Sequence, residues 1–278
     1  LKVFPGECVG VLGPNGCGKT TLFSMCIGEQ NPESGKIFLS NKAIDQIPIH
    51  LRSKEGLGYL PQQRSVFNLS TYDNIFGICQ LYFKDREKQK AITEKLLDEF
   101  NLQHLRNLNA SVLSGGEVRR VMLARLMINR PKIVLLDEPL AALDPQIIQD
   151  IQKYILKIQS SGTAILITDH NVRNLFDITD RSYVISEGQV IAEGTSRELL
   201  KVICRSLDVP ENEVIKVDGM VGMADLSELM LEERDDLLWP PFASRVPERL
   251  EDHNGDIFSA IRQKDLLLHH LYDLVYLI

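Results

Sequence analysis

A glycine-rich loop between a predicted strand and a predicted helix constrains the fold of this chain more than any other feature. The pattern G-x-x-x-x-G-K-T begins at Gly13. It follows the apolar run 8–12, the predicted strand, and precedes the segment 22–27, the predicted helix, which ends at a glycine. In this order, backbone N–H groups unhindered by side chains converge on an anion at a helix N-terminus. The pattern therefore predicts a phosphate-binding loop rather than a glycine-rich turn with a chance lysine. The loop residues are Gly13, Pro14, Asn15, Gly16, Cys17, Gly18, Lys19, Thr20 and Thr21.

Two side chains of this loop have specific expected roles. Lys19 is expected to reach the β- and γ-phosphates of a nucleotide. Thr20 is expected to hold Mg²⁺ through its hydroxyl.

Composition limits the classes of protein to which the chain can belong. With 278 residues, of which 44% are hydrophobic, it is predicted to be globular, with one large domain or two modest ones. A formal net charge of −7 argues against nucleic acid as the main partner, because such binding depends on clustered Lys and Arg. Five cysteines without C-x-x-C spacing argue against a zinc site or disulfide framework and indicate the cytosol. We find no signal peptide and no apolar run near the ~20 residues that cross a bilayer, and expect any membrane span to belong to another subunit.

Two acids end a strongly apolar segment. Asp137 and Glu138 follow the run 132–136, which is typical of a central parallel strand, and ligands bind at the carboxyl ends of such strands. We expect Asp137 to bind Mg²⁺ through water and Glu138 to polarise an attacking water. A further predicted strand, 164–168, brings His170 to the same sheet edge, where it is a candidate for contacting a γ-phosphate. A lone histidine is more often structural.

Helical periodicity replaces the short apolar runs between about residues 70 and 129, which predicts an inserted helical subdomain. Ser114 is a predicted N-cap for a helix over 118–129, and the glycines at 115 and 116 give that helix start a second potential anion site. By itself this segment is equally well explained as an ordinary helix start. Asp144 and a proline turn the chain into a helix whose isoleucine stripe is predicted to be core.

Residues 1 to about 200 resemble the nucleotide-binding subunit of an ATP-binding-cassette transporter. The resemblance rests on several motifs in the family's order. The matching positions are Gly13 to Thr21 for the Walker A loop, Gln62 for the Q-loop, Leu113 to Glu117 for the signature, Asp137 and Glu138 for the Walker B pair, Asp144 for the D-loop, and His170 for the switch histidine.

This resemblance implies an α/β P-loop NTPase of the cassette ATPase type, with ATP and Mg²⁺ as ligands and ATP hydrolysis as the reaction. In the family two subunits enclose two ATPs, each between the Walker A loop of one and the signature of the other. The implied partners are a second copy of the chain and integral membrane subunits, at the cytoplasmic face of the inner membrane. The implied catalytic residues are Glu138, His170 and Gln62, with Gln62 also at the metal. The implied nucleotide contacts beyond the loop are Ser114, Gly115, Gly116 and Asp144.

Within the family, three stretches are most similar to the ATPases of lipopolysaccharide export, with branched-chain amino-acid uptake ATPases as the alternative. They are Gly58 to Gln62, Ser70 to Asn74, and Ile167 to Arg173. The loop 63–69 is one residue shorter than the resemblance leads us to expect. The chain begins without Met, and we expect the upstream strand and the family's adenine-stacking aromatic residue to be missing.

The transporter resemblance ends near residue 200. Residues 201–278 resemble an internal piece of polyphosphate kinase and are expected to be an α/β fragment without that family's phosphorylated histidine, so that His269 and His270 are structural. A polyphosphate-handling fusion is therefore the least favoured function. A cassette ATPase acting on DNA or ribosomes is also disfavoured, because long coiled-coil insertions and basic arms are missing from the sequence.

Overall fold

A computed structural model describes residues 1–169 and 171–199. His170 and the predicted polyphosphate-kinase-like fragment, 201–278, lie outside the described residues.

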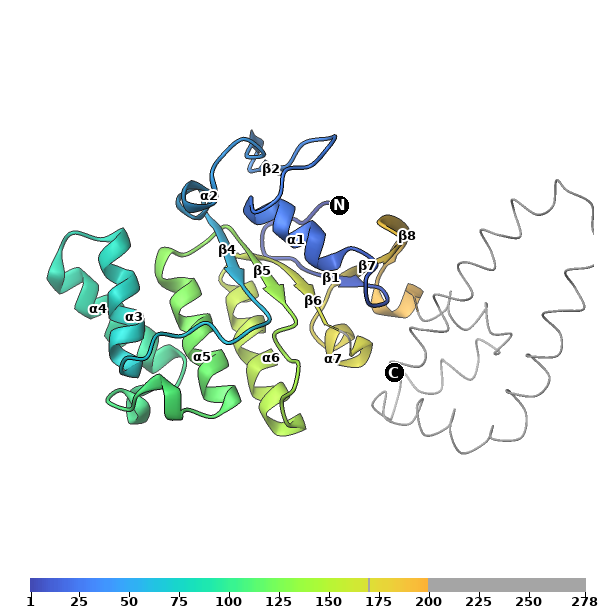
Figure 1. Cartoon of the computed structure of the whole chain (residues 1–278). Helices are drawn as coiled ribbons and strands as arrows, with labels where there is room; N and C mark the ends of the chain where they lie inside the picture. Colours follow the sequence, from blue (N-terminus) through green and yellow to red (C-terminus); the bar gives the residue numbers. More distant parts are fainter. Residues whose placement is uncertain (170, 200–278) are drawn as a thin grey trace, which may run out of the picture.

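A twisted sheet forms the centre of the described part of the chain (Figure 1). Its strand order is β4-β5-β6-β1-β7-β8, and every pairing is parallel except the hairpin β7–β8. A short second sheet pairs β2 with β3 in antiparallel order. The strands are β1 Cys8–Leu12, β2 Phe38–Leu39, β3 Lys42–Ala43, β4 Leu57–Leu60, β5 Ile133–Asp137, β6 Ala164–Thr168, β7 Arg181–Ser186 and β8 Gln189–Gly194.

The segment 70–129 is helical, as its periodicity predicts. The helix predicted over 118–129 begins earlier, at Gly115, because Ser114 caps it, and it ends at Leu126 before a 3₁₀ turn. The predicted C-terminal end at residue 129 therefore lies three residues beyond the end of the α-helix. The helices are α1 Lys19–Ile27, α2 Ile49–Glu55, α3 Thr71–Tyr82, α4 Arg86–Glu99, α5 Gly115–Leu126, α6 Pro145–Ser160 and α7 Val172–Phe176, and the 3₁₀ turns are Gln103–Leu105, Ala110–Val112 and Met127–Asn129.

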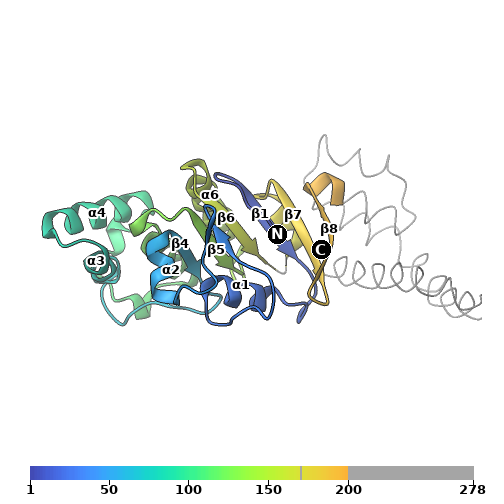
Figure 2. The ribbon, with the colours of Figure 1, turned by 90° about the horizontal axis from the view of Figure 1, so that it is seen from above.

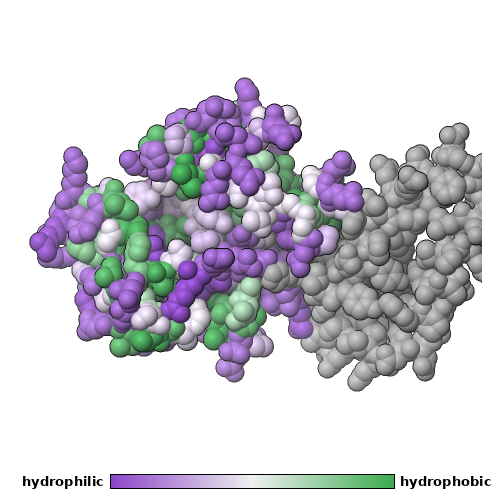
Figure 3. Space-filling view, in the orientation of Figure 1, coloured by the Kyte–Doolittle hydropathy of each residue, from purple (hydrophilic) through white to green (hydrophobic). Residues whose placement is uncertain are grey.

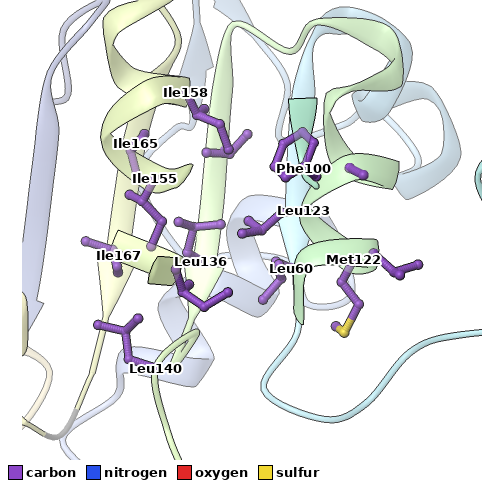
Figure 4. Close-up of a cluster of buried hydrophobic side chains, with 14 of the residues drawn as sticks. Leu60, Phe100, Met122, Leu123, Leu136, Leu140, Ile155, Ile158, Ile165 and Ile167 are labelled. Carbon is purple, nitrogen blue, oxygen red and sulfur yellow. The ribbon is translucent and has the colours of Figure 1, made fainter. Parts of the chain in front are cut away.

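Alternate residues of the buried strands enter two cores, one on each side of the sheet. On β5, Val134 and Leu136 pack with α5 and α6, whereas Leu135 packs with Phe23 of α1. Figure 2 shows α1 and α6 on opposite sides of the sheet. Figure 4 shows part of the larger core, where strand residues such as Leu136 meet helix residues such as Ile155. The predicted isoleucine stripe of α6 is core.

The parallel sheet brings chemically important segments to one edge. The carboxyl ends of β1, β4, β5 and β6 lead to the phosphate loop, to Gln62, to the two acids and to Asp169, respectively. In the strand register, Asp137 is paired with Thr168 and Thr168 is paired with Val11. Since parallel neighbours end together, these four segments form the candidate site.

Candidate functional site

The phosphate loop has a backbone that only glycine accepts at two positions. Gly18, the N-cap of α1, has φ 107° and offers no side chain, so the N–H groups of the first helical turn have no side-chain cap. Gly13 has φ 154°, and a Cβ there would lie 2.2 Å from the carbonyl oxygen of Ile185. A phosphate at this helix start would therefore meet free backbone donors and the positive end of the helix dipole.

Lys19 extends back over this loop and is nearly buried. Its Nζ donates to the carbonyl oxygens of Gly13 at 2.5 Å and Pro14 at 2.9 Å. Only 8% of the residue is exposed. Carbonyl oxygens can be exchanged for phosphate oxygens, so the ammonium is placed to bind an anion at the loop.

Asp137 is a buried carboxylate that accepts from two hydroxyl groups. Thr168 Oγ1 donates to its Oδ1 at 2.8 Å, and Tyr59 Oη donates to its Oδ2 at 3.4 Å. Burial, followed by the charge of Asp137, raises the pKa of Tyr59 to about 12, which keeps the phenol protonated as a donor. The same strand ends therefore fix both oxygens of the carboxylate.

The oxygen donors at this edge of the sheet fit Mg²⁺ in character. Carboxylate, hydroxyl and amide oxygens are available from Asp137, Thr20 and Gln62, and Mg²⁺ prefers oxygen ligands. Among the described residues no group of three or more His, Cys, Asp or Glu side chains could hold a metal by itself.

Glu138 lies at a sharp turn after β5 and contacts Gln62. Its φ is 48°, and its N–H donates to Thr168 O at 3.0 Å and to Thr168 Oγ1 at 3.2 Å. Gln62 Nε2 donates to the Glu138 carboxylate. The structure thus brings together two predicted catalytic residues that are far apart in the sequence.

Arg119 of α5 holds the backbone that carries Gln62. Its guanidinium donates to Pro61 O at 3.3 Å and Gln62 O at 3.4 Å, and burial lowers its pKa. Neither Arg119 nor Thr168 was predicted as a site residue. The sequence signal for Arg119 is a basic residue on the otherwise apolar face of α5. The signal for Thr168 is a hydroxyl at the end of the predicted strand that leads to His170.

The signature segment forms a reciprocal helix cap. The Ser114 N–H and hydroxyl both bond to Glu117 Oε2 at 2.8 Å, and the Glu117 N–H donates to Ser114 Oγ at 3.4 Å. Gly116 packs against α6 so closely that a Cβ would lie 2.4 Å from Ile147 Cγ2. Gly115 has more room, since a Cβ there would lie 3.3 Å from Leu143. Ser114 is therefore confirmed as an N-cap.

The signature and the phosphate loop lie on opposite sides of the sheet within one chain. Residues of α5 belong to the core on one face, whereas Phe23 and Ile27 of α1 belong to the core on the other. Asp144 is the exposed N-cap of α6, where Pro145 occupies the first helical position. The buried Asp169 accepts from the Leu140 N–H at 3.3 Å and so joins the loops after β5 and β6. His170, the remaining predicted site residue, lies outside the described residues.

Known proteins of one family are similar to this chain over the part that carries these motifs. The sequence pattern of the family described as ABC transporter matches residues 1–141. The chain belongs to the ATP-binding-cassette transporter family. This cassette ATPase is 43% identical over 203 residues to the lipopolysaccharide export system ATP-binding protein LptB of Escherichia coli (strain K12), covering 72% of this chain and 84% of that protein. The identity to the LptB protein of Haemophilus influenzae is 41% over 203 residues, with the same coverage.

Solved structures of cassette ATPases have the same fold. The cbiO1 protein from Clostridium perfringens, part of the ABC transporter complex cbiONQ, superposes with a TM-score of 0.68 and 29% identity, over 74% of this chain and 84% of that one. MJ1267, an ATP-binding cassette of an ABC transporter in its ADP conformation, superposes with a TM-score of 0.66 and 28% identity. The match covers 77% of this chain and 90% of that one. The predicted α/β P-loop fold of the cassette type is confirmed.

Membership of the family also confirms the predicted activity. This cassette ATPase is the ATP-binding and ATP-hydrolysing subunit of an ABC transporter. One solved cassette of this fold, MJ0796, is dimeric in a post-hydrolysis state bound to ADP and Pi. Within residues 1–169 and 171–199, none of the helices has both the length and the apolar character needed to span a membrane.

Proposed function

We propose that this cassette ATPase drives lipopolysaccharide export, as a homodimer at the cytoplasmic face of the inner membrane. The observation that carries the proposal is the identity of 41–43% to LptB proteins along 84% of their length. The cassette domain comprises residues 1–200 and includes a helical subdomain over about 70–129.

The residues of the candidate site have defined roles in this proposal. The loop Gly13 to Thr21 binds the triphosphate, with Lys19 as its counter-charge. Thr20, Gln62 and Asp137 hold Mg²⁺, which when bound offsets the negative charge on the phosphate oxygens. The uncapped start of α1 and the doubly hydrogen-bonded Asp137 support these assignments.

Glu138 is the proposed acceptor of a proton from the water that attacks the γ-phosphorus, so that the products are ADP and inorganic phosphate. Gln62 bonds to its carboxylate and orients it, and His170 is the proposed contact to the γ-phosphate. The hydrogen bond between Gln62 and Glu138, at the carboxyl ends of β4 and β5, supports the roles proposed for these two residues.

A second copy of the chain completes each site in the proposal. Ser114, Gly115 and Gly116 of one copy face the nucleotide bound by the phosphate loop of the other, and Asp144 lines the same boundary. The separation of α5 and α1 by the sheet supports a site shared between chains, because one chain does not bring its own signature to its own loop. The exposed position of Asp144 also agrees with an intermolecular role.

The membrane subunits are proposed to dock beside α2 and α3. A cavity of about 280 Å³ lies there, with Ile49, Tyr82 and Leu126 among its lining residues. Leu81 of α3, an apolar side chain that is 74% exposed, lies on the same helix as the lining residue Tyr82. Apolar residues also gather near α3 and α4 in Figure 3. Such a patch on a chain with a charged surface favours burial against a partner protein.

The test is reconstitution in liposomes with the membrane subunits of a lipopolysaccharide export system, in parallel with those of a branched-chain amino-acid uptake system. We expect ATPase stimulation and lipopolysaccharide movement with the first set only. The Glu138→Gln variant should assemble in the same way but turn over about 100-fold more slowly, since it lacks the proton acceptor. Stimulation by the amino-acid system alone would refute the proposed substrate. Parental turnover by Glu138→Gln would refute the proposed role of Glu138.

A further inference from the structure

We propose that Thr168 is a positioning residue for ATP hydrolysis, because its single hydroxyl fixes the two acids of the site relative to each other. This inference rests on the proposed roles of Asp137 in holding Mg²⁺ and of Glu138 in accepting a proton. Thr168 touches neither nucleotide nor metal in the proposal; it acts through the two acids.

The hydroxyl of Thr168 is used as a donor to one acid and as an acceptor from the other. It donates to Asp137 Oδ1 at 2.8 Å, and it accepts from the backbone N–H of Glu138 at 3.2 Å. A threonine hydroxyl has only one hydrogen to donate, so the bond to Asp137 fixes its orientation. The lone pairs then point away from Asp137, where the Glu138 N–H meets one of them.

The sheet fixes the position of this hydroxyl. Thr168 is the last residue of β6 and is fully buried. It is paired with Asp137 on the neighbouring strand β5 and with Val11 on the neighbouring strand β1. A β-branched side chain between two paired strands has little rotational freedom. The hydroxyl is therefore held rigidly at the point where the catalytic edge of the sheet begins.

Glu138 needs such support because its backbone is left-handed. A φ of 48° is unfavourable for a residue with a side chain, and such conformations persist only where neighbouring groups hold them. Here the Glu138 N–H is shared between the carbonyl and the hydroxyl of Thr168, at 3.0 Å and 3.2 Å. The hydroxyl therefore contributes both to the turn that directs Glu138 and to the orientation of the carboxylate of Asp137.

A matched pair of substitutions separates this role from simple stability. Thr168→Val keeps the shape and removes the hydroxyl. Thr163→Val makes the same chemical change at the other end of β6, where the Thr163 hydroxyl donates to Pro131 O at 3.1 Å, far from the acids. Both sites are buried, at 0% and 6% exposure, so the loss of a buried hydroxyl is similar in the two variants.

We expect Thr168→Val to lower turnover by about 10–100-fold, or to raise the Mg²⁺ concentration for half-maximal ATP binding by a similar factor, as is usual for groups that orient a metal ligand. Affinity for ATP measured in EDTA should not change, because the phosphate loop is untouched. In the protein without nucleotide, the amide hydrogen of Glu138 should exchange faster. Thr163→Val should change none of these quantities.

A second pair keeps the test decisive if the valine variant does not fold. Thr168→Ser and Thr168→Ala both lack the methyl group and differ in the hydroxyl, so only the serine variant should retain turnover within about threefold. If the serine and alanine variants, or the two valine variants, agree both in turnover and in the Mg²⁺ concentration for half-maximal ATP binding, the inference is overturned. Glu138→Gln in the same assay separates the two proposals: if it is inactive while Thr168→Val is normal, only the inference about Thr168 fails.

Discussion

Arg52 is the largest fully buried side chain described, and it provides a prediction whose size follows from its contacts. Only 1% of Arg52 is exposed, although it belongs to the short surface helix α2. Its guanidinium ties α2 to the C-terminal end of α1, the helix whose other end carries the phosphate loop. Its donors bond to four carbonyl oxygens, those of Ile47, Met25 and Cys26 at 2.7 Å and that of Asp45 at 2.8 Å.

The expected effect of Arg52→Met is the balance of two large contributions. A hydrogen bond from a charged donor contributes about 1.5–3 kcal/mol, so four of them give roughly 6–12 kcal/mol before costs. Taking a guanidinium out of water opposes this by several kcal/mol, and the same burial lowers the pKa of Arg52. We expect the free energy of unfolding to fall by about 3–5 kcal/mol, because four carbonyl groups lose their donor.

Urea unfolding followed by circular dichroism measures this change, with two controls. Arg52→Lys should recover little, since a compact ammonium cannot reach four carbonyl groups in two directions. Arg106→Met removes a half-exposed ion pair with Glu94 and should cost less than about 1 kcal/mol. A loss below about 1 kcal/mol for Arg52→Met, or full recovery with lysine, would refute the argument that the four bonds stabilise the fold.

Two further predictions concern the candidate site. Lys19→Ala should weaken binding of a fluorescent ATP analogue at least about 100-fold, or about 2.7 kcal/mol, because the triphosphate loses its buried counter-charge. The control is Lys36→Ala, which removes an exposed lysine. Equal affinity of the two variants would contradict the role assigned to Lys19. Bonds from the Ser114 N–H, then from its hydroxyl, hold the pKa of the Glu117 carboxyl below its ordinary value. A carboxyl group whose pKa is lowered by folding stabilises the folded state fully above about pH 4.3, the unfolded value. This stabilisation is lost as the pH falls through the pKa of the folded state. Glu117→Ala should therefore lower stability by about 1 kcal/mol at pH 7 and by less at pH 3, as urea titrations at both pH values can show.

Features with a local signal were predicted well. The strand over 164–168 and the isoleucine stripe of α6 agree with the structure, because apolar runs and helical spacing depend on neighbouring residues alone. The N-cap at Ser114 is equally local, since the cap is formed by Glu117 three residues later. In the same way, the loop pattern at Gly13 required no information beyond its own residues and flanks.

Features that depend on distant contacts were not predicted. Thr168 is important only because strand pairing places it beside Asp137, 31 residues earlier, and hydrophobic periodicity does not specify which strands pair. Arg119 is 58 residues from Pro61, whose carbonyl it bonds. Arg52 contradicts the preference of its residue type for the surface. Gln62 was predicted through the family resemblance alone, and its contact with Glu138 came from the fold.

The boundary of the cassette domain gives the last prediction, which concerns two truncations. We propose that the cassette folds and hydrolyses ATP without residues 206–278, since every proposed site residue precedes residue 171. The cut must spare Leu199, which is 3% exposed and packs in the larger core with residues such as Phe176. Just before it, the Thr195 N–H donates to Glu198 at 2.8 Å and begins the helical turn that carries Leu199.

Chain 1–205 should therefore keep ATPase activity per folded molecule within about twofold, because it loses no residue of the site. Chain 1–194 should be less stable by about 2–3 kcal/mol, because it exposes the core that Leu199 covers. ATPase rates and thermal unfolding of the full chain and both truncations provide the comparison. If chain 1–205 folds but does not hydrolyse ATP, residues beyond 205 contribute to the active cassette and the proposed boundary is wrong. If 1–194 matches 1–205 in stability, burial of Leu199 does not hold the end of the cassette against the sheet.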